Sequence, residues 1–180
     1  MVADWKTLDV EELLTSPIFR IERVRREHPR IGEADFFAMS LPDWVNVVAL
    51  TADDEVVLVR QYRHGTDEVT LEIPGGNVDA GESAEEAAAR ELREETGYVA
   101  ESWETIGTVE PNPAFMGNRC DTLVAVGAEK VEEPEPDQHE EFEVLTVSRS
   151  EFHARIRGGE IRHALVVAAA YHLRDWAEGR

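Results

Sequence analysis

The succession of predicted strands and helices in this 180-residue sequence indicates an α/β sandwich, in which one mixed β-sheet carries a helix on each face. Runs rich in β-branched residues recur along most of the chain. Helical patterns interrupt these runs at three places, and the length is sufficient for one domain with a substantial core.

The first predicted elements are strands. Residues 17–40 contain apolar runs on both sides of a turn at 28–33, and a second break follows at 41–43, where a proline stands. Two further strands are expected at 44–50 and 56–62, where β-branched residues predominate.

A strand at 69–73 leads into a loop that contains Gly75 and Gly76. Because its residues alternate in polarity, we expect Thr70 and Glu72 to point outward. The side chains expected to point inward are Val69, Leu71 and Ile73.

The second half of the chain is expected to add strands at 103–109, 121–126 and 142–147. Helices are expected at 150–157, which two glycines follow, and at 161–177. The last helix should pack through an apolar side that includes Ala164, Leu165, Ala168 and Leu173.

Composition narrows the classes of function. The formal net charge of −20 argues against a nucleic-acid backbone or an anionic membrane as a partner. The N-terminus has no apolar signal core and no run is long enough to cross a membrane, so we expect a cytoplasmic protein. The single cysteine, Cys120, excludes a disulfide within the chain and is expected to be a buried apolar residue.

The most informative stretch is 76–98, a glycine-bearing loop followed by a helix crowded with carboxylates. Ser83 and Glu86 have the spacing of a capping box, so the helix should begin there. Gly97 is suited to the left-handed position that ends a helix.

Three glutamates, Glu91, Glu94 and Glu95, share one face of this helix because residues three and four apart are neighbours on its surface. Like charges at this spacing repel, and an all-oxygen set suits a hard cation such as Mg²⁺ or Mn²⁺. A solvated acidic face is the alternative for these three glutamates taken alone.

The full spacing resembles the Nudix box: Gly76, five residues, Glu82, seven residues, then Arg-Glu-Leu-x-Glu-Glu-x-Gly and a bulky apolar residue, Tyr98. The resemblance implies a Nudix-type fold for a hydrolase domain at 41–180. It also implies that the strands within 1–40 form a separate small antiparallel sheet that helps to build a homodimer.

Roles within the box also follow from the resemblance. Glu91 and Glu95 are expected to be the principal ligands of Mg²⁺ or Mn²⁺, with Glu94 as a further ligand or bridge and the carbonyl of Gly75 as a backbone ligand. A metal so held neutralises diphosphate charge and lowers the pKa of a bound water. The expected supporting residues are Glu82, which braces the loop or acts through water, and Arg90, which orients the glutamates by salt bridges.

An Arg-Gln-Tyr-Arg run at 60–63 recurs in the ADP-ribose and nucleotide-sugar branch of the family. Arg60 and Arg63 belong to opposite strand faces, and either suits a diphosphate because a guanidinium binds phosphate oxygens bidentately. Glu72 is a candidate for holding a ribose or sugar hydroxyl, and Trp44 for stacking on a base. The alternatives are a surface role for the arginines and a core role for the tryptophan.

Pro113 lies sixteen residues after Gly97, an offset that accompanies ADP-ribose pyrophosphatase activity in this family. It belongs to the loop 110–120, in which Arg119 is a candidate contact for a phosphate. Two departures leave the sugar preference open: Pro-Gly-Gly rather than Ala-Gly leads into the box, and 114–116 lack the glycines found in many members.

The acidic stretch 132–141 contains the candidate general base. Related enzymes carry a glutamate here that closes over the site, so Glu140 is the first choice, Glu141 the second and Glu94 in the box the third. A solvated, mobile hairpin is the alternative for this stretch.

The sequence therefore predicts a metal-dependent pyrophosphohydrolase that cleaves a nucleoside diphosphate sugar, of the ADP-ribose or GDP-mannose type, to a nucleoside monophosphate and a sugar phosphate. A nucleoside triphosphate or a damaged nucleotide is the alternative substrate. A non-catalytic module that senses nucleotide sugars is the alternative class, and the complete set of box glutamates disfavours it.

Overall fold

The computed structural model describes residues 1–135, 138 and 140–179. The chain separates into two compact units, each of which is described by itself. The first consists of Met1–Pro42 and Glu110–Arg119, and the second of Asp43–Val109 and Cys120–Arg180.

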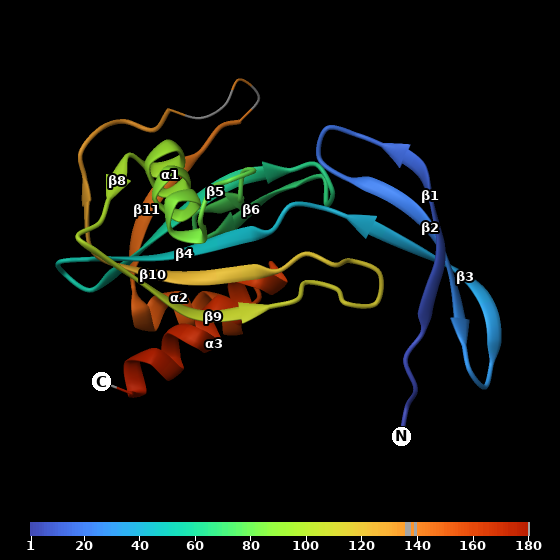
Figure 1. Ribbon diagram of the computed structural model, residues 1–180. Coiled ribbons are helices and arrows are strands. Elements are labelled where there is room, and N and C mark those ends of the chain that lie inside the picture. Colours follow the sequence, from blue (N-terminus) through green and yellow to red (C-terminus); the bar gives the residue numbers. More distant parts are fainter. Residues whose placement is uncertain (136–137, 139, 180) are drawn as a thin grey trace. The chain divides into compact units, whose positions relative to one another are not determined.

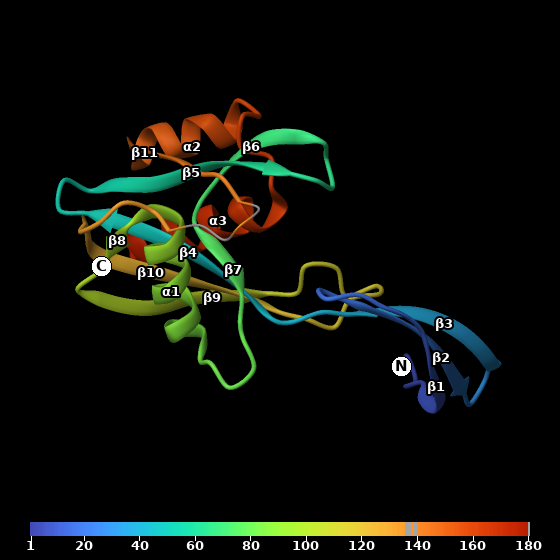
Figure 2. The ribbon, with the colours of Figure 1, turned by 90° about the horizontal axis from the view of Figure 1, so that it is seen from above.

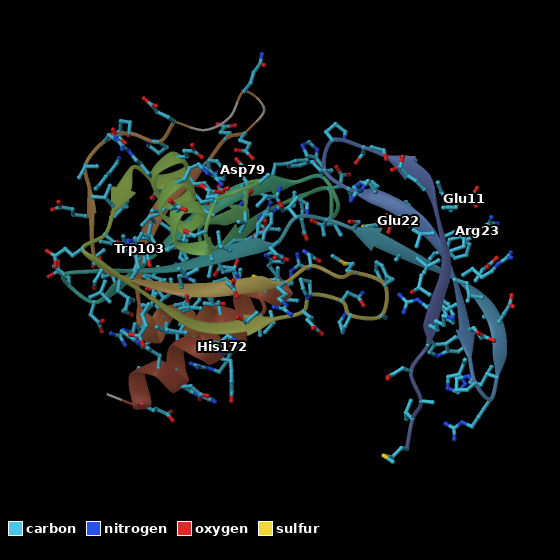
Figure 3. The ribbon with its side chains drawn as sticks, in the orientation of Figure 1. Glu11, Glu22, Arg23, Asp79, Trp103 and His172 are labelled. Carbon is cyan, nitrogen blue, oxygen red and sulfur yellow. The ribbon has the colours of Figure 1, made fainter. Side chains whose placement is uncertain are left out.

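The first unit is a three-stranded antiparallel sheet in the order β1-β2-β3, formed by Lys6–Thr15, Arg20–His28 and Gly32–Ser40 (Figure 1). The predicted turn connects β2 to β3. The sequence pattern did not predict β1, because register shifts at Thr7/Asp9 and Glu12/Leu14 interrupt the alternation of its side chains. Glu11 on β1 and Arg23 on β2 form an exposed ion pair between the two strands (Figure 3).

The loop 110–119 belongs to this first unit. The amide of Met39 on β3 donates a hydrogen bond of 2.7 Å to the carbonyl of Phe115 in the loop. The side-chain amide of Asn118 also donates to the carbonyl of Pro42 at 3.1 Å. These contacts attach the loop to the small sheet.

The second unit contains a mixed sheet of eight strands. Along the path β11-β5-β4-β10-β8 only β4 and β10 are parallel, while β6, β7 and β9 pair antiparallel with β5, β4 and β10. The strands are β4 Trp44–Thr51, β5 Glu55–Arg63, β6 Glu68–Glu72, β7 Gly75–Asn77, β8 Tyr98–Val99, β9 Ser102–Val109, β10 Cys120–Lys130 and β11 Glu143–Ser148.

Helix α1 (Ala84–Thr96) covers one face of this sheet, and α2 (Arg149–Arg157) and α3 (Ala164–Glu178) cover the other (Figure 1; Figure 2 gives the view from above). Alternate residues of β4 therefore enter two separate cores. Val47 packs in the cluster beneath α1, and Val48 packs in the cluster beneath α2 and α3. The predicted α/β sandwich is confirmed, and its strands are apolar on both faces because both faces are covered.

Two predicted burial patterns are wrong. On β6, Leu71 and, just after the strand, Ile73 are buried as expected, but Val69 is 64% exposed and Glu72 is only 2% exposed, contrary to expectation. The pattern failed because ion-pair partners surround Glu72, and a strand sequence does not show them. On α3, Ala164 is exposed, because the apolar residues of this helix extend around more than one side; its buried residues are Val166, Ala169, Ala170 and Leu173.

Cys120 is fully buried, as predicted, and burial raises the pKa of its thiol to about 12. Among the described residues, no helix is long and apolar enough to cross a membrane.

Candidate active site

The candidate site starts at the turn that leads into α1. The hydroxyl of Ser83 accepts a hydrogen bond of 3.2 Å from the amide of Glu86, whose carboxylate accepts one of 2.8 Å from the amide of Ser83. This is the predicted capping box. Gly97 ends the helix in the left-handed conformation, with φ of 73°, also as predicted.

The glycines before α1 allow two carboxylates to approach the backbone closely. Glu95 is 5% exposed, and its Oε2 accepts a hydrogen bond of 3.1 Å from the amide of Gly75. A Cβ atom at Gly76 would lie 2.1 Å from Oε1 of Glu91, so a larger residue there would force this carboxylate to move. The loop and the helix therefore bring both glutamates close to the backbone of the glycines.

The electrostatic environment of these carboxylates is unfavourable to their charged forms. Burial raises the pKa of Glu95 well above its usual value, and the negative charge of Glu91 raises it further, whereas the amide of Gly75 opposes the shift. Burial also raises the pKa of Glu91, although a hydrogen bond from Arg90 lowers it. A cation next to these oxygens would remove the conflict.

Arg90 provides part of that positive charge. Its guanidinium donates to the carboxylate of Glu82 with two bonds of 3.0 Å, to Glu91 at 2.8 Å and to Glu94 at 3.2 Å. The salt bridges expected of Arg90 are therefore present. Glu82 also accepts a bond of 3.1 Å from the amide of Asp79 (Figure 3), so it braces the loop.

The donor set fits a hard divalent cation. Within the part of the chain that the structure describes, no three or more His, Cys, Asp or Glu side chains are already grouped as metal ligands. The fit instead follows from the buried carboxylate of Glu95, which has acidic neighbours, and from the close approach of Glu91 to the backbone. The residues that would hold Mg²⁺ or Mn²⁺ are Glu91, Glu94 and Glu95, with the carbonyl of Gly75.

The predicted arginines lie on β5, with different partners. Arg63 donates from Nε and Nη2 to the two oxygens of Glu72, each at 2.9 Å, and its guanidinium carbon lies 5.8 Å from the centre of the Trp44 ring. Arg60 donates at 2.9 Å to Glu143 on β11. Trp44 is half-buried, and its Nε1 donates to the side-chain oxygen of Asn46 at 3.2 Å.

A cavity of about 630 Å³ extends along this end of β5, and its lining includes Arg60, Arg63, Glu140 and Glu141. Both glutamates are exposed. Of these two glutamates, Glu140 is the one whose negative charge raises the pKa values of Glu91 and Glu95. Its effect on both is smaller than that of burial. The cavity thus joins the predicted arginines to the stretch with the candidate base, of which 136, 137 and 139 lie outside the described residues.

The remaining predicted residues, Pro113 and Arg119, belong to the first unit and are exposed. Pro113 lines a cavity of about 390 Å³ together with Trp5, Phe36 and other residues. Sequence reasoning missed His163, whose Nδ1 lies 2.8 Å from Oε2 of Glu72. No local pattern reveals this contact, since it joins residues that are far apart in the chain.

Comparison with known proteins identifies the family to which this fold and this acidic helix belong. The model of the NUDIX domain matches residues 41–168, which is more than half of the chain, so the protein belongs to the NUDIX family. The predicted family membership is confirmed.

The similar proteins include hydrolases of ADP compounds and a methanol dehydrogenase activator of Bacillus methanolicus, which is 28% identical over 94% of this chain and 92% of that protein. The chain is 31% identical to an ADP-ribose pyrophosphatase of Mycobacterium tuberculosis, over 92% of this chain and 81% of that protein. It is 27% identical to an ADP compounds hydrolase of Escherichia coli, over 96% and 93%. A crystal structure of an ADP compounds hydrolase covers 99% of this chain and 97% of its own, with a TM-score of 0.88 and 26% identity.

Proposed function

We propose that the protein is a metal-dependent Nudix hydrolase that cleaves the diphosphate of an ADP-sugar such as ADP-ribose, giving AMP and a sugar phosphate. The observation that carries this proposal is the buried carboxylate of Glu95 on the acidic face of α1, whose pKa is raised by burial and by the charge of Glu91. The names of the relatives from Mycobacterium tuberculosis and Escherichia coli support the choice of substrate.

Different side chains are proposed to bind the metal, to act as the general base and to bind the diphosphate. Glu91, Glu94 and Glu95 would hold Mg²⁺ or Mn²⁺, which when bound neutralises diphosphate charge and lowers the pKa of a coordinated water. Glu140 would accept the proton of the attacking water, with Glu141 as the competing choice. Arg63 would donate to diphosphate oxygens, because its guanidinium lines the cavity that Glu140 also lines.

Further substrate contacts are proposed for residues around this centre. Arg60 is the second donor to the diphosphate, and Trp44 offers a ring on which a base can stack. Pro113 and Arg119, in the loop 110–119 of the first unit, are also proposed as substrate contacts. Nucleoside triphosphates are the alternative substrate, and GDP-mannose tests whether the base matters.

A panel of substrates tests the proposal. ADP-ribose, another ADP-sugar, GDP-mannose and ATP are incubated with the protein and Mg²⁺, and products are separated by anion-exchange chromatography. We expect ADP-sugars to give AMP and a sugar phosphate at the highest kcat/KM. Preference for ATP would favour the alternative substrate, and turnover of none of them would favour a sensing module.

We also propose that the protein is a cytoplasmic homodimer, in which 1–40 form the dimer and 41–180 form the hydrolase domain. The ten residues of β1 are all exposed, and the first unit exposes large apolar side chains, a property typical of interaction surfaces. The exposed apolar residues include Leu8, Val10, Leu13, Leu14, Ile18 and Phe37.

Light scattering at micromolar concentration measures the mass of the assembly. A two-fold pair of 20.2 kDa chains is the expected result, since a closed dimer is the commonest symmetric oligomer. The mass of one chain would contradict this part of the proposal. The net charge of −20 leads us to propose no nucleic acid or membrane as a partner.

A further inference from the structure

Arg63 and Thr70 donate hydrogen bonds to the carboxylate of Glu72, and Nδ1 of His163 lies within ion-pair distance of it without the geometry of a hydrogen bond. Oε1 accepts hydrogen bonds from Nε of Arg63 at 2.9 Å and from Thr70 at 2.6 Å, while Oε2 accepts from Nη2 of Arg63 at 2.9 Å and lies 2.8 Å from Nδ1 of His163. Although burial opposes ionisation, these donors hold the pKa of Glu72 well below its usual value. With 2% of its surface exposed, Glu72 offers no oxygen to a sugar hydroxyl.

Arg63 is fixed by the same contact. Because Nε and one N–H of Nη2 bind Glu72, the edge that remains is formed by Nη1 and the second N–H of Nη2. No partner of Nη1 is found among the described residues, and Arg63 lines the cavity with Glu140. This edge is a two-pronged donor of the kind that binds phosphate oxygens bidentately.

His163 stands at a position where helices usually place a different residue. It is the N-cap of α3, but its side chain makes no capping hydrogen bond and contacts Glu72 instead. Serine, threonine, aspartate and asparagine are preferred at N-caps because their side chains accept from the first amides of the helix. The residue at 163 therefore suits the contact with Glu72 and not the stability of α3.

We propose that His163 is a positioning residue for the reaction: with Glu72 it fixes the guanidinium of Arg63 in the orientation that receives the diphosphate. This inference rests on the proposed function and changes the role of Glu72, which acts through Arg63 and does not touch the sugar. Since a fixed guanidinium binds ground state and transition state alike, its loss raises KM more than it lowers kcat.

His163→Ser separates positioning from structure. Serine restores a capping side chain to α3 but does not reach Glu72. The new cap should offset part of the stability lost with the contact to this buried carboxylate, so the midpoint of thermal unfolding should fall only slightly. We expect KM for ADP-ribose to rise about tenfold, the equivalent of ~1.4 kcal/mol, with kcat within about twofold. The matched control is Arg162→Ser, which removes only an exposed ion pair with Glu68 and should leave both constants unchanged.

A double variant tests the route through Arg63. In an Arg63→Lys background, which has lost the two-pronged donor, His163→Ser should raise KM by less than about twofold. An unchanged KM in His163→Ser, or a full additional tenfold in the double variant, would overturn the proposal while leaving the hydrolase activity of the wild type intact.

The contact between His163 and Glu72 can also be tested without substrate, which matters if the wild type cleaves no ADP-sugar. The Nε–H of Arg63 is identified by ¹⁵N NMR as the signal that Arg63→Lys removes, and its exchange with water is measured. We expect slow exchange in the wild type and in Arg162→Ser, and exchange at least about tenfold faster in His163→Ser. Equal rates in His163→Ser and the wild type would show that His163 does not hold Arg63.

Discussion

Glu72 and Glu95 are both buried glutamates of the same unit, 2% and 5% exposed, yet their pKa values shift in opposite directions. Arg63, Thr70 and His163 surround Glu72 and keep it ionised despite its burial. Glu95 accepts one bond, from the amide of Gly75, and burial together with the charge of Glu91 disfavours its charged form.

The two carboxylates therefore differ in how the surrounding protein treats their charge. The protein itself neutralises Glu72, so this residue holds other groups in place. The protein does not neutralise the charge of Glu95 in the same way, as expected of a carboxylate that binds a divalent cation.

The largest effect is expected from removing the charge of Glu95. Glu95→Gln should lower kcat for ADP-ribose about a hundredfold or more while the fold survives, because it removes a ligand charge from the proposed metal site. The control is Glu85→Gln, on the exposed first turn of α1, which should retain wild-type turnover. Near-normal activity of Glu95→Gln at saturating Mg²⁺ would reject the assignment.

The next effect concerns the general base. Glu140→Gln should lower kcat about a hundredfold and leave KM within a few-fold, since a base acts in the chemical step. Raised Mg²⁺ should not rescue this variant. If Glu141→Gln loses activity and Glu140→Gln keeps it, the base is Glu141; if both keep it, Glu94 becomes the candidate.

A smaller effect on stability should distinguish the two buried glutamates. Glu72→Gln should lower the free energy of unfolding by about 2 kcal/mol, because it leaves Arg63 without its partner; the partial exposure of Arg63 moderates the loss. In metal-free buffer, Glu95→Gln should cause no loss, because it removes a buried charge that lacks a counter-charge. Urea unfolding at pH 7 measures both, and an equal loss in the two variants would contradict the comparison.

The loss of stability caused by Glu72→Gln should become smaller at low pH. The pKa of Glu72 lies below its usual value of 4.5 in the folded state, so its contribution is complete above about pH 5. As the pH falls below 4.5 the unfolded chain takes up the proton first, and the contribution is progressively lost. The difference in the free energy of unfolding between wild type and Glu72→Gln should therefore shrink as the pH falls from 5 towards 3.

The sequence predicted the parts of the molecule that depend on local patterns. The capping box at Ser83, the left-handed Gly97 and the shared face of Glu91 and Glu95 are properties of a few neighbouring residues. β1 was missed because its register shifts break the alternation of side chains, and the side of α3 was misjudged because the helix is apolar nearly all round.

Long-range contacts explain the remaining error at the site. Glu72 was expected in solvent because a charged residue on an alternating strand normally points there. Its burial depends on Arg63 from β5 and on His163 at the start of α3, and neither lies near it in the sequence. Such a contact becomes visible only when the strands and the helix are assembled.

Thermal unfolding with and without Mg²⁺ or Mn²⁺ tests most directly the claim that Glu95 is a ligand of a divalent cation. At a hundred times the dissociation constant, a bound ion should stabilise the wild type by about 2.7 kcal/mol, and Glu85→Gln should respond in the same way. Glu95→Gln should lose most of this gain. The account is contradicted if Glu95→Gln is stabilised as much as the wild type, or if neither ion raises the midpoint of the wild type.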